Sequence, residues 1–454
     1  MGKDLTEVRS PHRPLVPDDV GSEQHEPTFL RAIANKAKAD KRHRFRDLYR
    51  YLDEELLLHC WGELNKSAAS GVDEVTAEQY AQDLHANIAG LVQRLKTKRY
   101  RAKLVRRHYI LKENGKQRPL GIPALEDKLV QSAAAKLLMA IYEQEFLTCS
   151  YGYRPGRGAR DAVQDLTFEL QYGCYGYVVE ADVQGFFDHL SHDTILEMLR
   201  LRIDDRAFVN LIRKWLKAGI LEPDGYVVHP DTGTPQGGSV SPVLANVYLH
   251  YVLDLWFEKV VKPRCGDALL CRYADDWVCA FRYQEDAERF YRVLPKRLEK
   301  FNLKLAPEKT RLMRFSRFHP SMKRRFAFLG FEFYWKEDRS GTPRVQRRTA
   351  RKKLQAACRR IKEWIKSSRH VLVREFFKAL NTRLLGHYRY YGLRGNSLAL
   401  RRFYDWALAC AFKWLNRRGG RRGSLTWARF VYILELVQIA VPRITEPRFR
   451  GGVA

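Results

Sequence analysis

Two adjacent carboxylates, Asp275 and Asp276, lie between two apolar runs of the chain. The first run ends at Cys271 and the second begins at Trp277, which predicts two strands joined by a tight turn that carries the acidic pair. Like charges at a hairpin tip repel each other and favour a bound cation, and Mg²⁺ prefers carboxylate oxygens. A pair of such ions is a common arrangement in polymerases. The acidic pair alone is equally consistent with a solvated turn.

Two more segments fit the same chemistry. Residues 177–188 contain an apolar run that ends at Asp182 and is followed by a glycine and two aromatic residues. A strand that ends at Asp182 would carry a third carboxylate to the same metal pair. Residues 233–242 are rich in turn formers and open a helix that we expect to start near Ser241 (N-cap) and Pro242 (N1). Backbone N–H groups at such a helix start are free to meet a nucleotide.

Seven sequence blocks stand in one order along the chain: 118–123 (RPLGIP), 150–157 (SYGYRPGR), the Asp182 block, 236–238 (QGG), 273–276 (YADD), 305–310 (LAPEKT) and 328–331 (FLGF). In these blocks and their order the chain resembles the group II intron-encoded reverse transcriptases, also called maturases, over roughly residues 45 to 445. The resemblance implies an α+β fold. It is that of a right-hand polymerase, with fingers and palm made of an antiparallel sheet plus helices, and a three-helix thumb, the maturase X domain.

The resemblance and the composition together predict three parts. Residues 1–44 form a partly flexible N-terminal extension, 45–335 the fingers and palm, and 336–454 the thumb. Helical patterns occur at about 29–60 and 76–96, and three amphipathic stripes follow Gly341. No cysteine follows Cys410, so we expect no zinc-type endonuclease domain. The chain is most similar to short, endonuclease-less bacterial members such as those of class C introns, which are expected to prime from nascent strands or single-stranded sites.

The charge of the chain predicts a polyanionic partner. It has 81 Lys+Arg against 52 Asp+Glu, a formal net charge of +29, and residues 341–454 hold 27 Lys+Arg and five Asp+Glu, a net +22. An excess of this size, concentrated in the thumb, points to nucleic acid. No run of about 18 apolar residues predicts a membrane span. The eight cysteines, none in a C-x₂-C spacing, are expected to be reduced thiols. We therefore expect a nucleic-acid-associated protein of the bacterial cytoplasm; the sequence does not indicate its oligomeric state.

The resemblance implies roles for the carboxylates. Asp182 and Asp275 are the expected bridging ligands of two Mg²⁺ ions, for which Mn²⁺ can substitute, and Asp276 completes the carboxylate set. Val183, directly after Asp182, is expected to belong to the metal site as well. In polynucleotide synthesis one ion activates the primer 3′-hydroxyl and the other stabilises the leaving pyrophosphate.

A second group of residues is expected to contact the dNTP: Lys112, Lys116, Arg118, Phe186, Gln236 and Lys309. Lys112, Lys116 and Arg118 come from a hairpin-like stretch and should reach the triphosphate from the fingers. A bulky ring at Phe186 would clash with a ribose 2′-hydroxyl, although Phe187 is an alternative for this sugar gate, since the two rings point oppositely in an extended segment. Lys309 is expected near the leaving pyrophosphate or, alternatively, at the solvated surface.

A third group is expected to bind nucleic acid: Arg154, Arg157, Arg347, Arg348, Arg351, Lys352, Lys353, His387, Tyr388, Arg389, Arg417, Arg418, Arg421 and Arg422. The arginines and lysines suit phosphate contacts, and the aromatic residues between them suit stacking on bases, although each aromatic can equally be helix core. The expected partners are the group II intron RNA in a ribonucleoprotein, an RNA template with a DNA primer or target DNA, and dNTP.

The sequence thus predicts an RNA-directed DNA polymerase of a group II intron, which copies intron RNA by target-primed synthesis and binds that RNA to assist splicing and mobility. Two alternatives stay open at this stage. One is a free-standing relative used in DNA repair or phage defence. The other is a splicing cofactor that binds RNA without synthesis, against which the intact Asp182, Asp275 and Asp276 argue.

Overall fold

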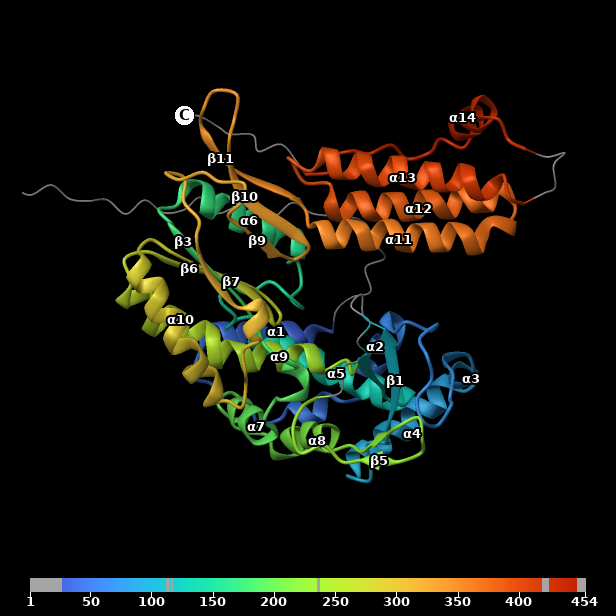
Figure 1. Cartoon of the computed structure of the whole chain (residues 1–454). Helices are drawn as coiled ribbons and strands as arrows, with labels where there is room; N and C mark the ends of the chain where they lie inside the picture. Colours follow the sequence, from blue (N-terminus) through green and yellow to red (C-terminus); the bar gives the residue numbers. More distant parts are fainter. Residues whose placement is uncertain (1–26, 112–114, 116, 235–236, 419–423, 447–454) are drawn as a thin grey trace, which may run out of the picture.

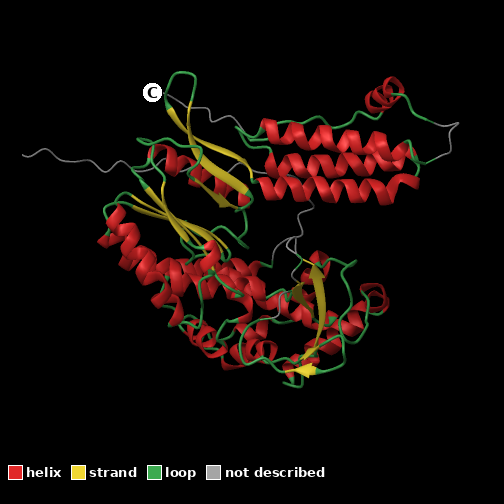
Figure 2. Ribbon diagram, in the orientation of Figure 1, coloured by secondary structure: helices red, strands yellow, loops and turns green. Residues whose placement is uncertain are grey.

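A computed structural model of the 454-residue chain describes residues 27–111, 115, 117–234, 237–418 and 424–446. Helices make up most of the described chain, and the strands are gathered in three small sheets (Figure 2). Three long helices near the C-terminus lie side by side as a separate layer beside the sheet-containing part (Figure 1). The mixture of helices and mainly antiparallel sheets confirms the predicted α+β class.

The first part of the chain is mostly helical. Its helices are α1 (Thr28–Ala39), η1 (Leu48–Tyr51), α2 (Glu54–Glu63), α3 (Ala77–Gln82), α4 (Leu84–Lys96), α5 (Leu125–Tyr142), α6 (Ala159–Tyr172), α7 (His192–Arg200) and α8 (Arg206–Leu216). The two long helical patterns predicted at 29–60 and 76–96 are each interrupted. The first is broken where Phe45 forms a β-bridge with Ile203, and the second at Asp83, whose φ of −125° and ψ of 45° are not helical.

The central four-stranded sheet has the order β6-β7-β3-β8, with every neighbouring pair antiparallel. Its strands are β3 (Tyr177–Asp182), β6 (Ala268–Tyr273), β7 (Asp276–Phe281) and β8 (Arg311–Arg314). Around it lie α9 (Ser241–Leu249), two π-helical segments (His250–Asp254 and Phe257–Val261), the 3₁₀ turns Phe186–Asp188, Lys262–Arg264 and Pro307–Lys309, and α10 (Gln284–Glu299). Helix α9 begins at Ser241 with Val240 as its N-cap, one residue before the predicted cap.

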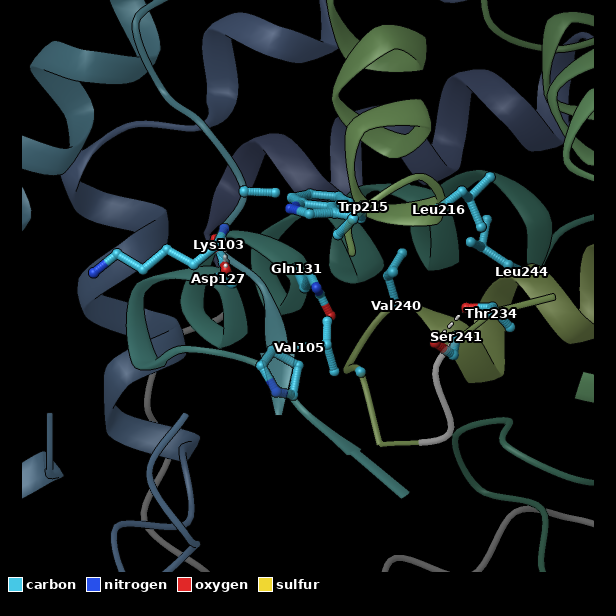
Figure 3. Close-up of a pocket in the computed structure, with 14 residues that line it drawn as sticks. Lys103, Val105, Asp127, Gln131, Trp215, Leu216, Thr234, Val240, Ser241 and Leu244 are labelled. Carbon is cyan, nitrogen blue, oxygen red and sulfur yellow. Dashed lines mark hydrogen bonds between the residues drawn. The ribbon is translucent and has the colours of Figure 1, made fainter. Parts of the chain in front are cut away.

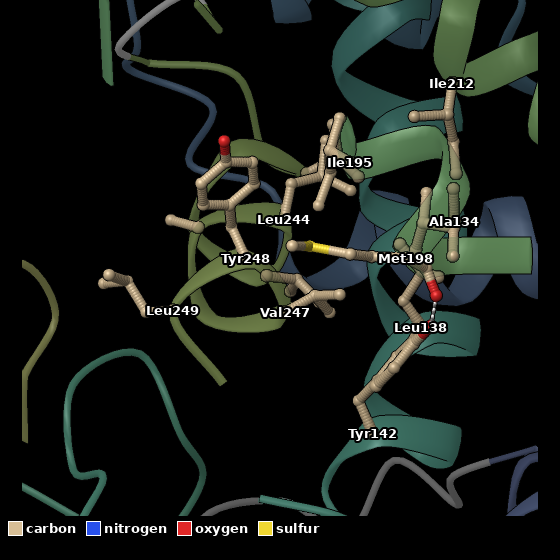
Figure 4. Packing of buried hydrophobic residues seen from close by; sticks show 14 of the residues in the cluster. Ala134, Leu138, Tyr142, Ile195, Met198, Ile212, Leu244, Val247, Tyr248 and Leu249 are labelled. Atoms are coloured by element: carbon tan, nitrogen blue, oxygen red, sulfur yellow. Dashed lines mark hydrogen bonds between the residues drawn. The ribbon is translucent and has the colours of Figure 1, made fainter. Parts of the chain in front are cut away.

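The main core joins this sheet to the helices. Leu138 and Tyr142 of α5, Met198 of α7, and Leu244 and Val247 of α9 pack together in it (Figure 4). Helix α1 belongs to the same core, because its Leu30, Ile33 and Ala37 are buried and the helix packs on α5. The predicted extension at 1–44 is therefore not separate from the fingers and palm over residues 28–39, whereas residues 1–26 lie outside the described part of the chain.

A second sheet of four strands has the order β2-β1-β4-β5. Its strands are β1 (Val105–Leu111), β2 (Gln117–Ile122), β4 (Ile220–Leu221) and β5 (Val227–Val228). β1 and β2 form an antiparallel hairpin, as the sequence predicts, and β1 runs parallel to β4.

A three-stranded sheet leads into the C-terminal helices. It contains β9 (Arg325–Phe328), β10 (Phe331–Glu337) and β11 (Pro343–Thr349), in the order β11-β10-β9. The helices that follow are α11 (Arg351–Ser367), the 3₁₀ turn Ser368–His370, α12 (Val373–Tyr391), α13 (Ser397–Leu415) and α14 (Trp427–Leu436). The three predicted amphipathic stripes correspond to α11, α12 and α13, which share one hydrophobic cluster. A domain boundary at 335/336 would cut β10, so the helical unit begins at Arg351. Over the described ranges, no helix is long and apolar enough to cross a membrane.

Candidate active site

Strand register brings the three predicted carboxylates together. Asp182 is the last residue of β3 and pairs directly with Asp276, the first residue of β7. Asp276 also pairs with Tyr273, the last residue of β6, so residues 274 and 275 form a two-residue hairpin turn that carries Asp275. Cross-strand neighbours in an antiparallel sheet lie about 5 Å apart. The tips of three strands therefore present three carboxylates at one edge of the sheet.

The electrostatics of this edge reflect the crowding of like charge. Burial, together with the nearby charges of Asp182 and Asp275, raises the pKa of Asp276 to about 7. Burial and the charge of Asp182 also raise the pKa of Asp275, against the opposing effects of Arg118 and Lys309. Neighbouring carboxylates do not all ionise easily, because their negative charges repel each other. A divalent cation offsets this repulsion and stabilises the ionised forms.

The donor set fits hard divalent metals, which prefer carboxylate and carbonyl oxygens. Within the described ranges no three His, Cys, Asp or Glu side chains already converge as a metal ligand set. Instead the Lys309 ammonium donates to the Asp182 carboxylate and forms an ion pair with it. This hydrogen bond raises the pKa of Lys309. Val183 is buried and forms a β-bridge with Leu305, which holds the loop before Lys309 against the end of β3.

The hairpin turn is packed against the 150–157 block. Ala274 has a φ of 55°, in the left-handed region that non-glycine residues rarely adopt. A Cβ at Gly152 would lie 2.5 Å from the Ala274 backbone nitrogen, so only a glycine allows this approach. Two of the blocks that carry the resemblance, more than one hundred residues apart in the chain, thus meet through their backbones.

The β1–β2 hairpin faces the same edge. Arg118 lies exposed in β2. Burial raises the pKa values of Asp275 and Tyr153, and the positive charge of Arg118 offsets part of that rise. Gly237 has a φ of 128°, and a Cβ there would lie 2.4 Å from the Gly121 carbonyl oxygen, so the glycine-rich segment packs directly on β2. The predicted nucleotide contacts Lys112, Lys116 and Gln236 lie outside the described residues.

A small enclosed cavity lies behind the glycine-rich segment (Figure 3). Thr234 and Ser241, on either side of that segment, share a hydrogen bond of 2.8 Å between their hydroxyl oxygens. Asp127 of α5 accepts hydrogen bonds from the Tyr100 hydroxyl and from the Lys103 backbone at 3.0 Å, and burial raises its pKa to about 6. The Thr234–Ser241 bond joins the two ends of the glycine-rich segment at the start of α9.

The two candidate sugar-gate rings are both in the core. Phe186 is 2% exposed and Phe187 is 7% exposed, and their ring centroids lie 5.3 Å apart in an edge-to-face arrangement. Phe186 also packs edge-to-face on Tyr248 of α9. The segment is a 3₁₀ turn that follows Gly185, which has a φ of 55°. It is therefore not extended, and the alternation of side chains along a strand does not decide which ring is the gate.

Two predicted phosphate ligands are used inside the protein. Arg154 is buried, and its guanidinium pairs with Glu143 at 2.6 Å and donates to the backbone carbonyls of Leu147 and Ser150. Arg347 is also buried and pairs with Glu446 at 3.0 Å. The structure thus corrects their assignment to a nucleic-acid surface, since both guanidinium groups are covered and paired.

Two predicted base-stacking residues are likewise internal. His387 stacks on Phe403 with a centroid distance of 3.8 Å, and burial lowers its pKa to about 4. Tyr388 is fully buried, and its hydroxyl donates to the Ala440 carbonyl at 3.1 Å. Tyr388 belongs to the core of the helical unit, and the half-buried His387 already stacks on Phe403 inside the protein, so the expectation that they stack on bases is also corrected.

The other predicted nucleic-acid ligands lie at the surface to differing extents. Arg351, Lys352, Lys353, Arg389 and Arg417 are exposed. Arg157 and Arg418 are half-buried and donate to backbone carbonyls, those of Thr148 and Val371. Arg348 pairs with Glu332 at 2.9 Å and keeps 38% of its side chain exposed. Arg421 and Arg422 lie outside the described part of the chain.

Sequence reasoning missed a buried charged residue beside the turn. Arg272, the residue before Tyr273, is fully buried and pairs with the equally buried Asp254. The sequence signal for it was a charged residue that directly follows the apolar run 268–271.

A second contact that the sequence did not predict joins the helical unit to the site: the Tyr390 hydroxyl of α12 donates to the Leu329 carbonyl at 3.0 Å. Leu329 in turn hydrogen-bonds Asp276 through its backbone N–H, which offsets part of the rise that burial causes in the pKa of that carboxyl.

Comparison with known proteins agrees with this geometry. A sequence model of the reverse transcriptase (RNA-dependent DNA polymerase) family matches residues 110–333, which include the three carboxylates. Protein YkfC of Escherichia coli K12 is 33% identical over 311 residues, which cover 61% of this chain and 78% of YkfC.

Two other relatives have names that refer to introns. Group II intron-encoded protein LtrA of Lactococcus lactis subsp. cremoris is 38% identical over 237 residues, and these cover 50% of this chain but 38% of LtrA. The mitochondrial nuclear intron maturase 1 of Arabidopsis thaliana is 27% identical over 95 residues, or 21% of this chain and 13% of that protein. The chain thus matches well under half the length of LtrA. It belongs to the reverse transcriptase family, among the group II intron-encoded reverse transcriptases and maturases.

Proposed function

We propose that this protein is an RNA-directed DNA polymerase that copies group II intron RNA into DNA and also binds that RNA to assist splicing and mobility. The observation that carries the proposal is the register of β3 with β7, which sets Asp182 opposite Asp276 beside the Asp275 turn. The family match over 110–333 and the intron-encoded relatives support it. No feature of the described chain favours a splicing cofactor without synthesis, because all three carboxylates are present and adjacent.

In this proposal Asp182, Asp275 and Asp276, with the Val183 carbonyl, hold two Mg²⁺ ions, which Mn²⁺ can replace. The ions would activate the primer 3′-hydroxyl and stabilise the charge on the leaving pyrophosphate. Lys309, which pairs with Asp182, would contact the triphosphate in this proposal. Arg118 brings positive charge to the same edge from the fingers side, where Lys112, Lys116 and Gln236 are proposed to add contacts.

The nucleic-acid surface is proposed to include a basic groove at the start of the thumb. The groove, about 640 Å³ in volume, lies between the solvent face of β10–β11 and the first turns of α11 and α13. Its cationic lining residues are Arg325, Lys336, Arg348, Arg351 and Arg402, against one acid, Glu332. Tyr334 lies in its floor, with the Arg348 guanidinium 5.2 Å from the ring centroid. Cations around an aromatic floor suit the phosphates and bases of single-stranded or looped RNA.

The proposed polymerase function also implies the other partners of the protein. The expected substrates are an RNA template with a DNA primer or target DNA, and dNTP. The part from α1 to β11 is proposed to act as fingers and palm, and the basic helical unit from Arg351 as the thumb. The protein is proposed to work bound to nucleic acid in the bacterial cytoplasm.

Removal of one carboxylate should abolish synthesis. Asp275→Ala takes away a metal-bound charge, and such interactions contribute several kcal/mol to transition-state stabilisation, so we expect primer extension on an RNA template to fall by at least about 100-fold. RNA affinity should stay within a few fold, because binding depends on other surfaces. The matched control is Asp193→Ala, an exposed acid in the first turn of α7. Extension by Asp275→Ala at a near wild-type rate would contradict the assignment.

The sugar gate is tested by paired substitutions. Phe186→Val should raise incorporation of ribonucleotides relative to deoxyribonucleotides, because loss of one steric clash is worth roughly 1–3 kcal/mol, or about 5- to 150-fold. The kcat/KM ratio for rNTP and dNTP is measured within each variant, so that loss of core packing cancels. Phe187→Val is the matched partner. A ratio that moves for Phe187→Val alone would transfer the gate to that ring, and two unchanged ratios would dismiss it.

The basic groove predicts a salt-dependent loss of RNA binding. Each phosphate contact contributes roughly 0.7–0.9 to the magnitude of the slope of log K against log salt. Replacement of four lining residues, Lys336, Arg348, Arg351 and Arg402, by Ala should weaken binding to structured RNA and reduce that slope by about 3, with little change in sequence preference. The control removes four exposed cations of α8 and α10 and the turn after α8: Arg206, Lys217, Lys296 and Lys300. Equal slopes for the two variants would show that the RNA lies on another surface.

A further inference from the structure

Arg272 is the largest charged side chain that the core encloses next to the catalytic turn. It lies in β6, one residue before Tyr273, and has no exposed surface. Its guanidinium forms a two-bond pair with Asp254, with Nε–Oδ1 and Nη2–Oδ2 distances of 2.7 and 2.6 Å. Asp254 is also fully buried, at the end of the π-helical segment 250–254.

The same guanidinium reaches the turn itself. Arg272 Nη1 donates to the Ala274 carbonyl oxygen at 3.0 Å and to Asn246 Oδ1 at 3.1 Å. Asn246 of α9 then donates through Nδ2 to the Gly152 carbonyl at 2.7 Å. Because the Ala274 carbonyl belongs to the peptide group that leads into Asp275, this contact fixes the orientation of the peptide that carries a proposed metal ligand.

Arg272 also ties the 149–152 loop to β6. Its Nη2 donates to Ser150 Oγ at 2.7 Å, and its backbone N–H and C=O bond Cys149 and Tyr151 at 2.8 and 2.9 Å. The turn at residues 274 and 275 is therefore held from two sides. The guanidinium holds the Ala274 carbonyl, and the backbone at Gly152 lies against the Ala274 nitrogen.

The chemistry of this network requires arginine. A buried ion pair is often no more stabilising than a well-packed apolar pair, because removing both charges from water is costly. The pair therefore adds little stability that Leu or Met could not supply. The planar Arg272 guanidinium, in contrast, bonds Asp254, Asn246, Ser150 and Ala274 in fixed directions. A lysine at this position keeps the charge but cannot maintain these directions together.

Resting on the proposed polymerase function, we propose that Arg272 is a positioning residue for catalysis. Through its bonds to Asp254, Asn246 and Ser150 it holds the Ala274 carbonyl, and thereby the Asp275 carboxylate, in the geometry that binds divalent metal. Arg272 itself contacts no substrate.

The test compares Arg272→Lys with Arg202→Lys in the full chain. Arg202 is a matched control, since its guanidinium is also buried and pairs with Glu145, at a place in the fold that does not contact the turn. For each variant, kcat for primer extension, the half-saturating Mg²⁺ concentration, RNA affinity and the melting temperature are measured. A role in stability alone would lower the melting temperature of both variants and leave kcat and the Mg²⁺ requirement per folded molecule unchanged.

We expect Arg272→Lys to lower kcat by about 10- to 100-fold, as a small misplacement of a reacting group does, and to raise the half-saturating Mg²⁺ concentration by about tenfold or more. RNA affinity should not change, and Mn²⁺, which binds most sites more tightly than Mg²⁺, should restore part of the rate. Arg202→Lys should keep wild-type kcat and Mg²⁺ dependence. Wild-type values for Arg272→Lys, or equal changes in both variants, would overturn the proposal.

Ser150→Ala serves as the milder variant if Arg272→Lys does not fold. It removes a single bond to the guanidinium and should shift kcat and the Mg²⁺ requirement in the same direction by a smaller factor, about two- to fivefold. An unchanged Mg²⁺ requirement in a folded Ser150→Ala protein would also overturn the proposal.

Failure of the proposed polymerase function can be distinguished from failure of the Arg272 proposal, because it would appear in the wild-type protein as absent or metal-independent synthesis.

Discussion

The antiparallel pairing of β3 with β7 is the constraint on which the rest of the site depends. It sets Asp182 beside Asp276, with Asp275 one residue away, and so forces three like charges into one edge of a sheet. Burial of these carboxylates and their mutual repulsion oppose folding, and together they raise the pKa values of Asp275 and Asp276. The apolar strands behind them, with Val178, Val179 and Trp277 fully buried, supply the opposing stabilisation.

Several elements far apart in the chain serve this edge. The 149–152 loop and α9 hold the turn through Arg272 and Asn246, and Val183 and Leu305 hold the segment that carries Lys309. The helical unit also reaches the site, because Tyr390 of α12 bonds the turn between β9 and β10, whose Leu329 contacts Asp276. A basic unit that is proposed to bind RNA is therefore joined by two hydrogen bonds to a proposed metal ligand.

The turn that carries Asp275 and the three amphipathic helices could be predicted from the sequence, because both depend on the local spacing of apolar and charged residues. Asp275 and Asp276 follow an apolar strand, and the stripes of α11 to α13 keep a helical period. The burial of Arg154 and Arg347 could not be predicted in that way, because a basic residue looks the same in sequence whether it meets phosphate or an internal acid. The partner of Arg347 lies 99 residues away, at Glu446. The predicted boundary at 335/336 falls inside β10, which pairs with the next strand, β11, across a short turn.

The central claim is that Asp182, Asp275 and Asp276 hold divalent metal at this edge of the sheet. Iron-mediated cleavage tests it most directly: Fe²⁺ takes the place of Mg²⁺, and added peroxide and ascorbate generate radicals that cut the backbone beside the bound ion. We expect cuts near residues 182 and 275 that excess Mg²⁺ suppresses and that Asp182→Asn abolishes. Cuts elsewhere in the chain, or cuts at these places that neither Mg²⁺ nor the substitution changes, would contradict it.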